Sequence, residues 1–343
     1  MTATLPAGWT LAASAFNVTP EVIRAARAAP ELALSLIDRG VSDTIEIEPG
    51  QMWRGFPAPS PSETGDFRAA LEKRAGRVSI VGGSIDEWTS GPRRRTEEER
   101  YAFLLPQLHA AAAVGAAGIR VPIGQPGAEL VDRLLPVLDE LDLILFEEVQ
   151  GRQTPADAAH AAAYDDIIRR DHPRLRLLLD ISMLMPALPE TYLAELERGG
   201  VSADLVGRLR TDWADPATQG AVFAELGAGR VPPAVHTLFM DLVVRFGRSR
   251  VAEIADVLPW VGAVHLKFWD LDDADDRVSA PIRELAPALR ASGFAGTLCS
   301  EWGGHEWLEE DPWDMTRRHL ALAVDALADG LSTHPHPDEA RAR

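Results

Sequence analysis

The sequence predicts a single (β/α)8 barrel, the fold in which parallel strands alternate with helices around a closed sheet. Apolar β-type runs alternate with long helical stretches rich in Ala, Leu and Arg, which is typical of βα units on a parallel sheet. Several runs end in a charged side chain, as strands do where a barrel presents functional groups at its C-terminal face. We expect the barrel to occupy residues 1–330 and a disordered tail, rich in Pro, His and charge, to occupy 331–343.

Composition bounds the class of protein and of partner. The 343 residues are 46% hydrophobic and 25% charged, which is ordinary for a globular protein with a large core. The formal net charge of −18 argues against nucleic acid and against an anionic membrane surface as partners. No run approaches the roughly 18 apolar residues of a membrane span, and no leader-like segment is evident. Because the only cysteine is Cys299, no disulfide can form within the chain, and we expect a cytoplasmic protein.

The first half of the chain is expected to supply four strands and the helices between them. The segment 44–48 alternates strictly, so that Ile45 and Ile47 share one face and the acids share the other. The loop 49–64 is rich in Pro, Gly and Ser, carries Trp53, and is expected to overhang the site. We place strands at 11–16, 44–48, 78–81 and 118–122, and helices at 20–28, 31–38, 65–75, 97–114 and 128–141.

The second half continues the alternation with one interruption. Between the sixth and seventh strands, residues 186–259 are helical sequence punctuated by Pro and Gly, without a convincing strand. This insertion could serve as a surface for a partner or as a lid over substrate. We place strands at 143–149, 175–181, 263–268 and 297–301, and helices at 155–170, 281–291 and 312–327.

Four strand ends carry a set of side chains suited to a metal ion. These candidate ligands are three carboxylates and one imidazole on separate strands, a donor set that serves a hard or borderline divalent cation. Such acids could instead cap helices or pair with arginines. Strand alternation places the adjacent Glu147 on the opposite face, although a bulge would reverse that choice. The candidate ligands are Glu148, Asp180, His265 and Glu301.

Further residues near these strand ends are candidates for catalysis and substrate binding. Lys267 shares the face of His265 and could polarise a carbonyl, or could merely balance charge. His305 follows Glu301 by four residues and could act as acid or base, or could be an exposed loop histidine. Tryptophans at or just beyond strand ends could stack on a sugar ring, or could be loop-packing residues. These tryptophans are Trp53, Trp88, Trp269 and Trp302.

The order Glu, Asp, His, Glu along four strand ends resembles the xylose-isomerase-like barrel superfamily of sugar isomerases and epimerases. Within that superfamily two segments are most similar to the α (catalytic) subunit of bacterial C-glycoside deglycosidases. Residues 264–269 have the pattern His-x-Lys-Phe-aromatic, and residues 300–305 have the pattern Ser-Glu-aromatic-x-Gly-His. The similarity extends over most of the chain.

This resemblance implies a divalent metal, typically manganese, with magnesium, cobalt or zinc as alternatives, held by the four candidate ligands. It also implies a small β subunit that forms a hetero-oligomer with the chain, and a glycoside substrate already oxidised to the 3-keto form. The C2 proton would be removed and the C1–aglycone bond would then break by elimination, since a metal-polarised carbonyl stabilises the carbanion beside it. The alternatives are a metal-dependent ketose isomerase or epimerase working through an enediolate, and a non-catalytic sugar-binding barrel.

The sequence departs from this pattern at two places. The family often has Glu-x-His where this chain has Glu148-Val149-Gln150. Gln150 therefore occupies a catalytic position but cannot be a general base, and that role would have to move to His305 or Lys267. Many epimerases have a histidine three residues after the sixth-strand Asp, where this chain has Met183, which weakens the epimerase alternative.

Overall fold

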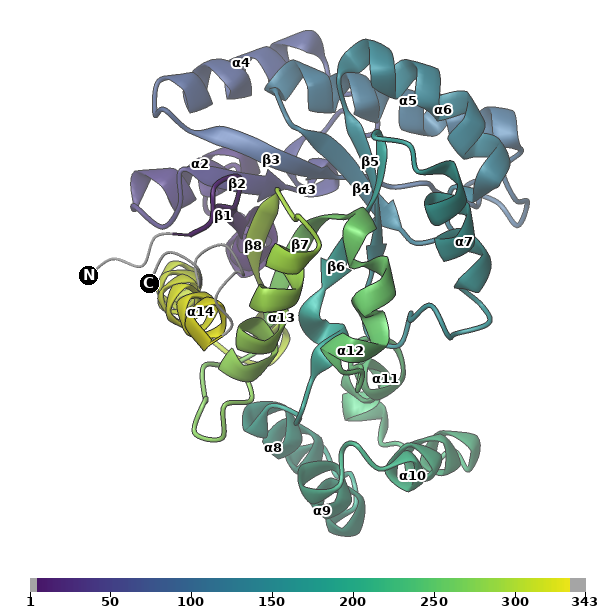
Figure 1. Cartoon of the computed structure of the whole chain (residues 1–343), viewed down its shortest axis with the longest axis vertical. Helices are drawn as coiled ribbons and strands as arrows, with labels where there is room; N and C mark the ends of the chain where they lie inside the picture. Colours follow the sequence, from purple (N-terminus) through teal and green to yellow (C-terminus); the bar gives the residue numbers. More distant parts are fainter. Residues whose placement is uncertain (1–4, 334–343) are drawn as a thin grey trace, which may run out of the picture.

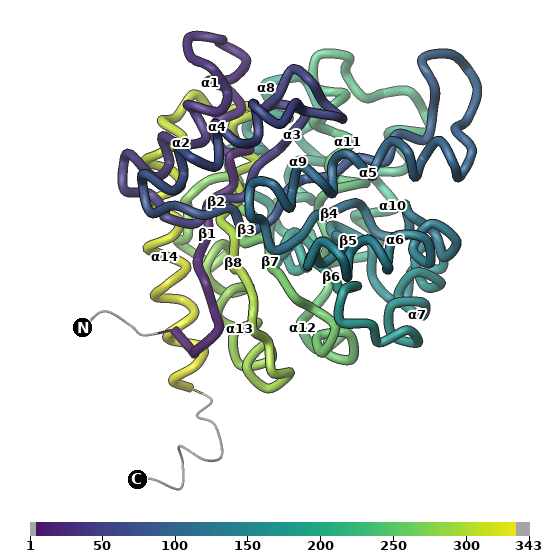
Figure 2. Tube along the Cα trace, turned by 90° about the horizontal axis from the view of Figure 1, so that it is seen from above, coloured from purple at the N-terminus to yellow at the C-terminus, as the bar shows by residue number. Residues whose placement is uncertain are grey.

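Eight parallel strands form a closed barrel in which β8 pairs with β1 (Figure 1). The structure is a computed structural model that describes residues 5–333. Seen from above, the helices surround the strands (Figure 2). The predicted barrel is confirmed. The strands are β1 (Thr10–Ser14), β2 (Thr44–Ile47), β3 (Arg77–Gly82), β4 (Gly118–Pro122), β5 (Ile144–Val149), β6 (Leu175–Asp180), β7 (Val261–Phe268) and β8 (Thr297–Trp302).

An apolar plug fills the lower interior of the barrel. It is formed by Ile80, Phe146, Leu178 and Ala263, one from each of β3, β5, β6 and β7. Gly118 makes room for this plug, because a Cβ there would lie 2.7 Å from the Phe146 ring. Side chains two residues further along each strand point to the same interior, one layer closer to the C-terminal face. This layer is where the strands carry their charged residues.

The helices outside the barrel begin and end largely where turn and capping residues dictate. Ser60 caps α4 in a reciprocal arrangement with Glu63, so this helix begins at Pro61 rather than at the predicted residue 65. Helix α7 begins at Ala161, later than the predicted residue 155. The helices are α1 (Thr19–Arg24), α2 (Ala29–Asp38), α3 (Pro49–Met52), α4 (Pro61–Glu72), α5 (Glu97–Val114), α6 (Gly127–Leu141), α7 (Ala161–Arg170), α13 (Ser279–Ala291) and α14 (Pro312–Thr333).

Between β6 and β7 the chain forms a group of helices with a core of its own. Tyr192, Leu209, Phe239 and Phe246 are buried there in a cluster distinct from the main core. Helices α8, α9 and α10 lie apart from the barrel strands, at the bottom of Figure 1. Trp269, just beyond β7, belongs to the same cluster and joins it to the barrel. These helices are α8 (Glu190–Arg198), α9 (Ala203–Thr211), α10 (Pro216–Gly227), α11 (His236–Val244) and α12 (Val251–Ile254).

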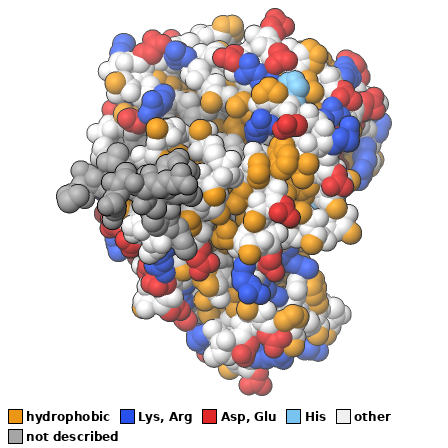
Figure 3. Space-filling model, in the orientation of Figure 1, with side chains coloured by type: hydrophobic (Ala, Val, Ile, Leu, Met, Phe, Trp, Pro, Cys, Tyr) orange, Lys and Arg blue, Asp and Glu red, His pale blue; other side chains and the backbone are white. Residues whose placement is uncertain are grey.

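The predicted C-terminal tail begins too early. Residues 331–333 continue α14, whose buried residues extend to Gly330, and residues 334–343 lie outside the described part of the chain. Within residues 5–333, no helix combines the length and hydropathy that crossing a membrane requires. On the face drawn in Figure 3, basic and acidic side chains are interspersed rather than gathered by sign.

Candidate metal centre and active site

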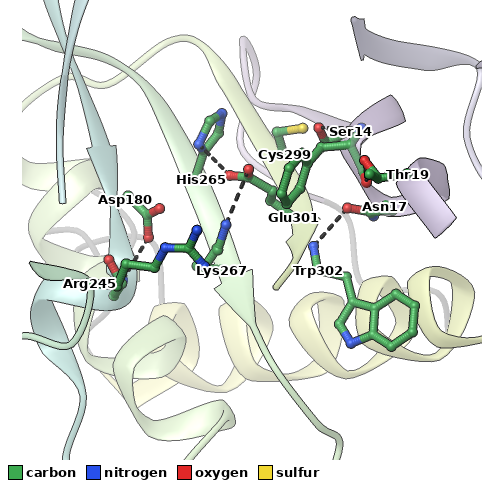
Figure 4. A network of polar contacts seen from close by, with 12 residues as sticks. Ser14, Asn17, Thr19, Asp180, Arg245, His265, Lys267, Cys299, Glu301 and Trp302 are labelled. Carbon is green, nitrogen blue, oxygen red and sulfur yellow. Dashed lines mark hydrogen bonds and ion pairs between the residues drawn. The ribbon is translucent and has the colours of Figure 1, made fainter. Parts of the chain in front are cut away.

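Four side chains converge at the C-terminal end of the barrel. Their potential ligand atoms all lie within 4.8 Å of one another, and all four residues are buried. They come from β5, β6, β7 and β8, which are consecutive around the barrel. The structure thus brings together the residues that the sequence predicts as metal ligands, and three of them are drawn in Figure 4. The four are Glu148, Asp180, His265 and Glu301.

His265 stands at the centre of this cluster, and its two ring nitrogens face different carboxylates. Nδ1 lies 2.7 Å from Glu301 Oε2 and 3.0 Å from Glu148 Oε1. Nε2 lies 3.0 Å from Glu46 Oε2. Burial alone would lower the pKa of His265, but the surrounding carboxylate charges outweigh burial and hold that pKa well above its ordinary value. Nδ1 is therefore the nitrogen on the cluster side, and Nε2 is the one that a carboxylate outside the cluster can orient.

The donor set and the charge of this site both fit a divalent cation. Three buried carboxylates and one imidazole nitrogen are ligands that Mn²⁺ and Mg²⁺ accept. Burial and the charges of Glu301 and Glu148 raise the pKa of Asp180 to about 6, against the opposing charge of Lys267. A bound cation would favour the ionised form of this buried carboxyl and so offset the cost of its burial. A second possible group, Glu46 with His265 and Cys299, fits less well because burial raises the pKa of the Cys299 thiol.

Glu147 lies away from the cluster. Its carboxylate Oε2 accepts a hydrogen bond from the backbone N–H of Gly124 at 2.6 Å. Burial raises its pKa to about 7. The regular alternation of β5 thus places Glu148 in the interior and Glu147 between the strand and the outer layer, as the sequence indicates.

The cluster opens into a cavity of about 480 Å³. Glu148 and Glu301 line it, together with Gln150 and Lys267, so the cavity joins the predicted ligands to two of the predicted catalytic residues. The remaining lining residues are Phe16, Glu48, Gly50, Gln51, Phe56, Gly82, Gly83, Ser84, Arg120 and Arg245.

Arg120 and two glutamates of β2 and its end belong to this site and are absent from the sequence prediction. Arg120 Nε lies 2.6 Å from Glu46 Oε1, and its Nη1 lies 2.9 Å from Glu148 Oε2. Its Nη2 pairs with Glu48. The sequence does indicate this network in one respect. Arg120 is a lone arginine inside the apolar strand Gly-Ile-Arg-Val-Pro, and a charge buried in a barrel strand requires partners of opposite charge.

Lys267 is held as an ammonium at the edge of the cluster. Its Nζ lies 3.2 Å from Glu301 Oε1 and 5.0 Å from the centre of the Phe16 ring. Burial lowers its pKa, but the charges of Glu301 and Asp180 outweigh burial, so the net pKa is raised. Lys267 can therefore stabilise developing negative charge on a substrate oxygen but cannot take up a proton.

His305 does not reach this cavity, which corrects its prediction as acid or base. Its ring packs against Phe16 at 4.8 Å and against Trp302 at 5.6 Å, and it lines a separate cavity of about 780 Å³. The turn after β8 causes this placement, since Gly304 packs so closely on Trp269 that a Cβ there would lie 1.8 Å from its carbonyl oxygen. Burial lowers the pKa of His305 to about 4.

The predicted stacking tryptophans do not line the cavity either. Trp302 is fully buried, and its indole donates a hydrogen bond to the Trp269 carbonyl at 2.8 Å. Trp269 packs against Phe246 of the insertion at 4.8 Å and lines a small pocket beside Lys267.

Trp53 is buried against Phe67, and Trp88 is 47% exposed on the loop after β3, beside Arg94. None of the four predicted tryptophans is among the residues that line the cavity. The aromatic side chains that do line the cavity are Phe16 and Phe56.

Comparison with known proteins agrees with the resemblance seen in the sequence. No family model matches the chain. The chain is 26% identical over 332 residues to the C-glycoside deglycosidase alpha subunit of Arthrobacter globiformis, covering 94% of each chain. It is 26% identical over 295 residues to the 3'-dehydrocarminate deglycosidase alpha subunit of a Microbacterium species, covering 81% of this chain and 84% of the relative.

Solved structures with the same fold include two sugar epimerases. The chain matches an L-ribulose 3-epimerase with a TM-score of 0.52 at 14% identity, covering 97% and 98% of the two chains. It matches a D-psicose 3-epimerase with a TM-score of 0.51 at 12% identity, covering 94% and 99%. These matches show the xylose-isomerase-like barrel fold. Because the relatives that match along most of the chain are named as deglycosidase subunits, the prediction of an enzyme is also confirmed.

Proposed function

We propose that the chain is the catalytic subunit of a metal-dependent enzyme that cleaves the sugar–aglycone bond of 3-oxo-glycosides, C-glycosides among them. The observation that carries this proposal is the cluster of three carboxylates and one histidine that opens into a 480 Å³ cavity. Similarity to C-glycoside deglycosidase alpha subunits along almost the whole chain supports this choice of reaction.

The residues of the site have distinct tasks in this reaction. Glu148, Asp180, His265 and Glu301 would hold the metal, for which we propose manganese. The metal would act as a Lewis acid that stabilises negative charge on the oxygen of the sugar carbonyl. Lys267 would add a second positive charge near that oxygen.

The chemistry requires one proton transfer and one bond cleavage. A base takes the proton from C2, and the electron pair of the C–H bond passes into the enolate of the 3-oxo group. The enolate then re-forms the ketone, a C1–C2 double bond appears, and the aglycone leaves with the electrons of its bond to C1. The 3-oxo group makes both steps accessible because it acidifies the C2 hydrogen.

We also propose a small partner subunit, because the relatives are named as alpha subunits. The helices between β6 and β7 form a separate group with a core of their own and could serve either as a surface for this partner or as a lid over substrate.

Exchange in D2O tests the proposed reaction. Manganese-loaded protein is incubated with 3-oxo-glucosides and, separately, with free ketohexoses, and proton NMR follows C2 exchange and aglycone release. We expect both C2 exchange and aglycone release on the 3-oxo-glucoside. The rates of both should fall at least about 100-fold in Glu301→Gln. Exchange on free ketohexoses alone would contradict the proposal and would indicate an isomerase or epimerase.

A further inference from the structure

We propose that Glu48 is the general base that removes the C2 proton, an inference that rests on the proposed function. The site lacks a base at the expected position, because Gln150 cannot accept a proton there. A carboxylate elsewhere in the same cavity can take over this task, and Glu48 is placed to do so.

Glu48 lines the same cavity as Glu148 and Glu301 and lies beside the cluster, because the Arg120 guanidinium contacts both Glu48 and Glu148. Glu48 directly follows β2, whereas the four cluster residues come from β5 to β8. A sugar bound in this cavity with its carbonyl oxygen toward the cluster can present a C–H bond to the neighbouring Glu48 carboxylate.

The structure holds the Glu48 carboxylate in a defined position. Its Oε1 pairs with the Arg120 guanidinium, which also contacts Glu46 and Glu148. Its Oε2 lies over Gly82, where the Cβ of any other residue would be 2.1 Å away. Glycine at this position thus leaves the space that the carboxylate occupies, and Arg120 fixes its orientation.

The surroundings of Glu48 also suit a base that works near neutral pH. Burial is the main cause that raises its pKa to about 7, and the charges of Glu46 and Glu301 add to it against Arg120. A base whose pKa lies near the working pH combines a large ionised fraction with strong proton affinity.

The other titratable side chains near the cavity cannot be the general base, each for a different reason. Lys267 is held as an ammonium beside Glu301. Glu148 and Glu301 belong to the proposed metal set. His305 lines a different cavity. Among the described lining residues, Glu48 is the remaining carboxylate.

In the proposed step, the C2–H bond breaks and its proton forms an O–H bond with the Glu48 carboxylate. The electron pair stays on the sugar as the enolate until the aglycone leaves. The protonated Glu48 can then return the proton to the departing aglycone anion or to solvent, so that the carboxylate is regenerated and no further reactant is needed.

The test compares Glu48→Gln with the matched control Glu147→Gln. Burial raises the pKa of each glutamate to about 7, but Glu147 faces away from the cavity. Full-length manganese-loaded proteins are assayed for C2 exchange on a 3-oxo-glucoside in D2O, and manganese affinity is measured by EPR titration. We expect Glu48→Gln to lose about 10²–10⁴-fold in exchange. The manganese affinity of Glu48→Gln should be unchanged. Glu147→Gln should match the wild type in both the rate of C2 exchange and the manganese affinity.

Chemical rescue separates a base from a structural residue. Glu48→Ala leaves a gap beside Arg120 that a small carboxylate can enter, so added formate should restore exchange at least about 10-fold over the rate without formate. Wild-type exchange in Glu48→Gln, loss of manganese binding by that variant, or no rescue by formate would each overturn the assignment while leaving the proposed function intact. An inactive wild-type protein with manganese bound would instead overturn the proposed function, and the assignment with it.

Discussion

At the scale of single residues, the site depends on charges that are buried together. Arg120 compensates three carboxylates at once, which a lysine could not do because it lacks the planar fork of donors. Lys267 and His265 both pair with Glu301. The acidic side chains of this cluster still outnumber the cationic ones, and this excess of negative charge favours binding of a cation at this end of the barrel.

His319 shows the opposite case, a buried histidine kept neutral. Its ring stacks on Phe268 at 3.8 Å, and its Nδ1 lies 2.8 Å from Ser300 Oγ, one residue before Glu301. Burial lowers its pKa to about 3. Below the unfolded pKa of about 6.5, the unfolded chain therefore binds a proton at this residue that the folded chain does not.

The sign of this linkage gives a pH prediction. The contribution of His319 to the free energy of unfolding is fully present above pH 6.5 and is lost as the pH falls toward 3. Between pH 7 and pH 5 it should amount to about 2 kcal/mol. We expect His319→Leu to lose less free energy of unfolding than the wild type over that interval, as measured by urea denaturation at both pH values. An unchanged difference would show that His319 is protonated in the folded protein.

At the scale of elements, Asn17 holds the turn after β1 against the end of β8 (Figure 4). Its Oδ1 accepts a hydrogen bond from the Trp302 N–H at 2.7 Å, and its Nδ2 donates to the Ser300 carbonyl at 3.1 Å. Nδ2 also donates to Thr316 Oγ1 of α14 at 3.0 Å. One amide thus joins η1 (Ala15–Val18), β8 and α14 where the barrel closes beside Glu301.

Replacing this amide by a carboxylate should weaken the closure. Asn17→Asp keeps the shape but removes both donors and places a charge among buried groups, so we expect the free energy of unfolding to fall by roughly 2–5 kcal/mol. Chemical denaturation measures the change. Gln219→Glu, the same chemical change at a partly exposed helical position, should stay within about 0.5 kcal/mol. Equal effects of the two substitutions would contradict the bridging role of Asn17.

Alternation along the strands explains how much of the site could be predicted from the sequence. Glu148, Asp180, His265 and Glu301 could be found because each ends or nearly ends an apolar run, and parallel strand ends must converge. Glu46 and Glu48 were visible as acids on one face, but the sequence could not show that this face is the interior.

The loops could not be predicted in the same way. Whether His305 or a tryptophan reaches the cavity depends on contacts between distant segments. Phe16 packs on His305, and the indole of Trp302 binds the Trp269 carbonyl. Such contacts leave no periodic pattern in the sequence. Selecting residues only because they lie near a strand end therefore predicts more binding residues than the cavity contains.

At the scale of the whole molecule, the candidate metal site connects half of the barrel. Its ligands come from the four consecutive strands β5 to β8, and Arg120 extends the network to β4 and β2. The helices between β6 and β7 are tied to the same end, since Arg245 after α11 pairs with Glu306 after β8. Binding of a cation at this site should therefore stabilise the fold as a whole and not only one loop.

This coupling predicts a manganese-dependent melting temperature. A cation at 100 times its dissociation constant adds about 2.7 kcal/mol to the free energy of unfolding, which for a chain of this length raises Tm by about 4 °C. Differential scanning calorimetry of metal-free protein, with and without manganese, measures the shift. Asp180→Asn should abolish it because a charged ligand is lost, whereas Glu147→Gln should retain it. An equal shift in Asp180→Asn would place the bound manganese elsewhere, with the group of Glu46, His265 and Cys299 as the next candidate.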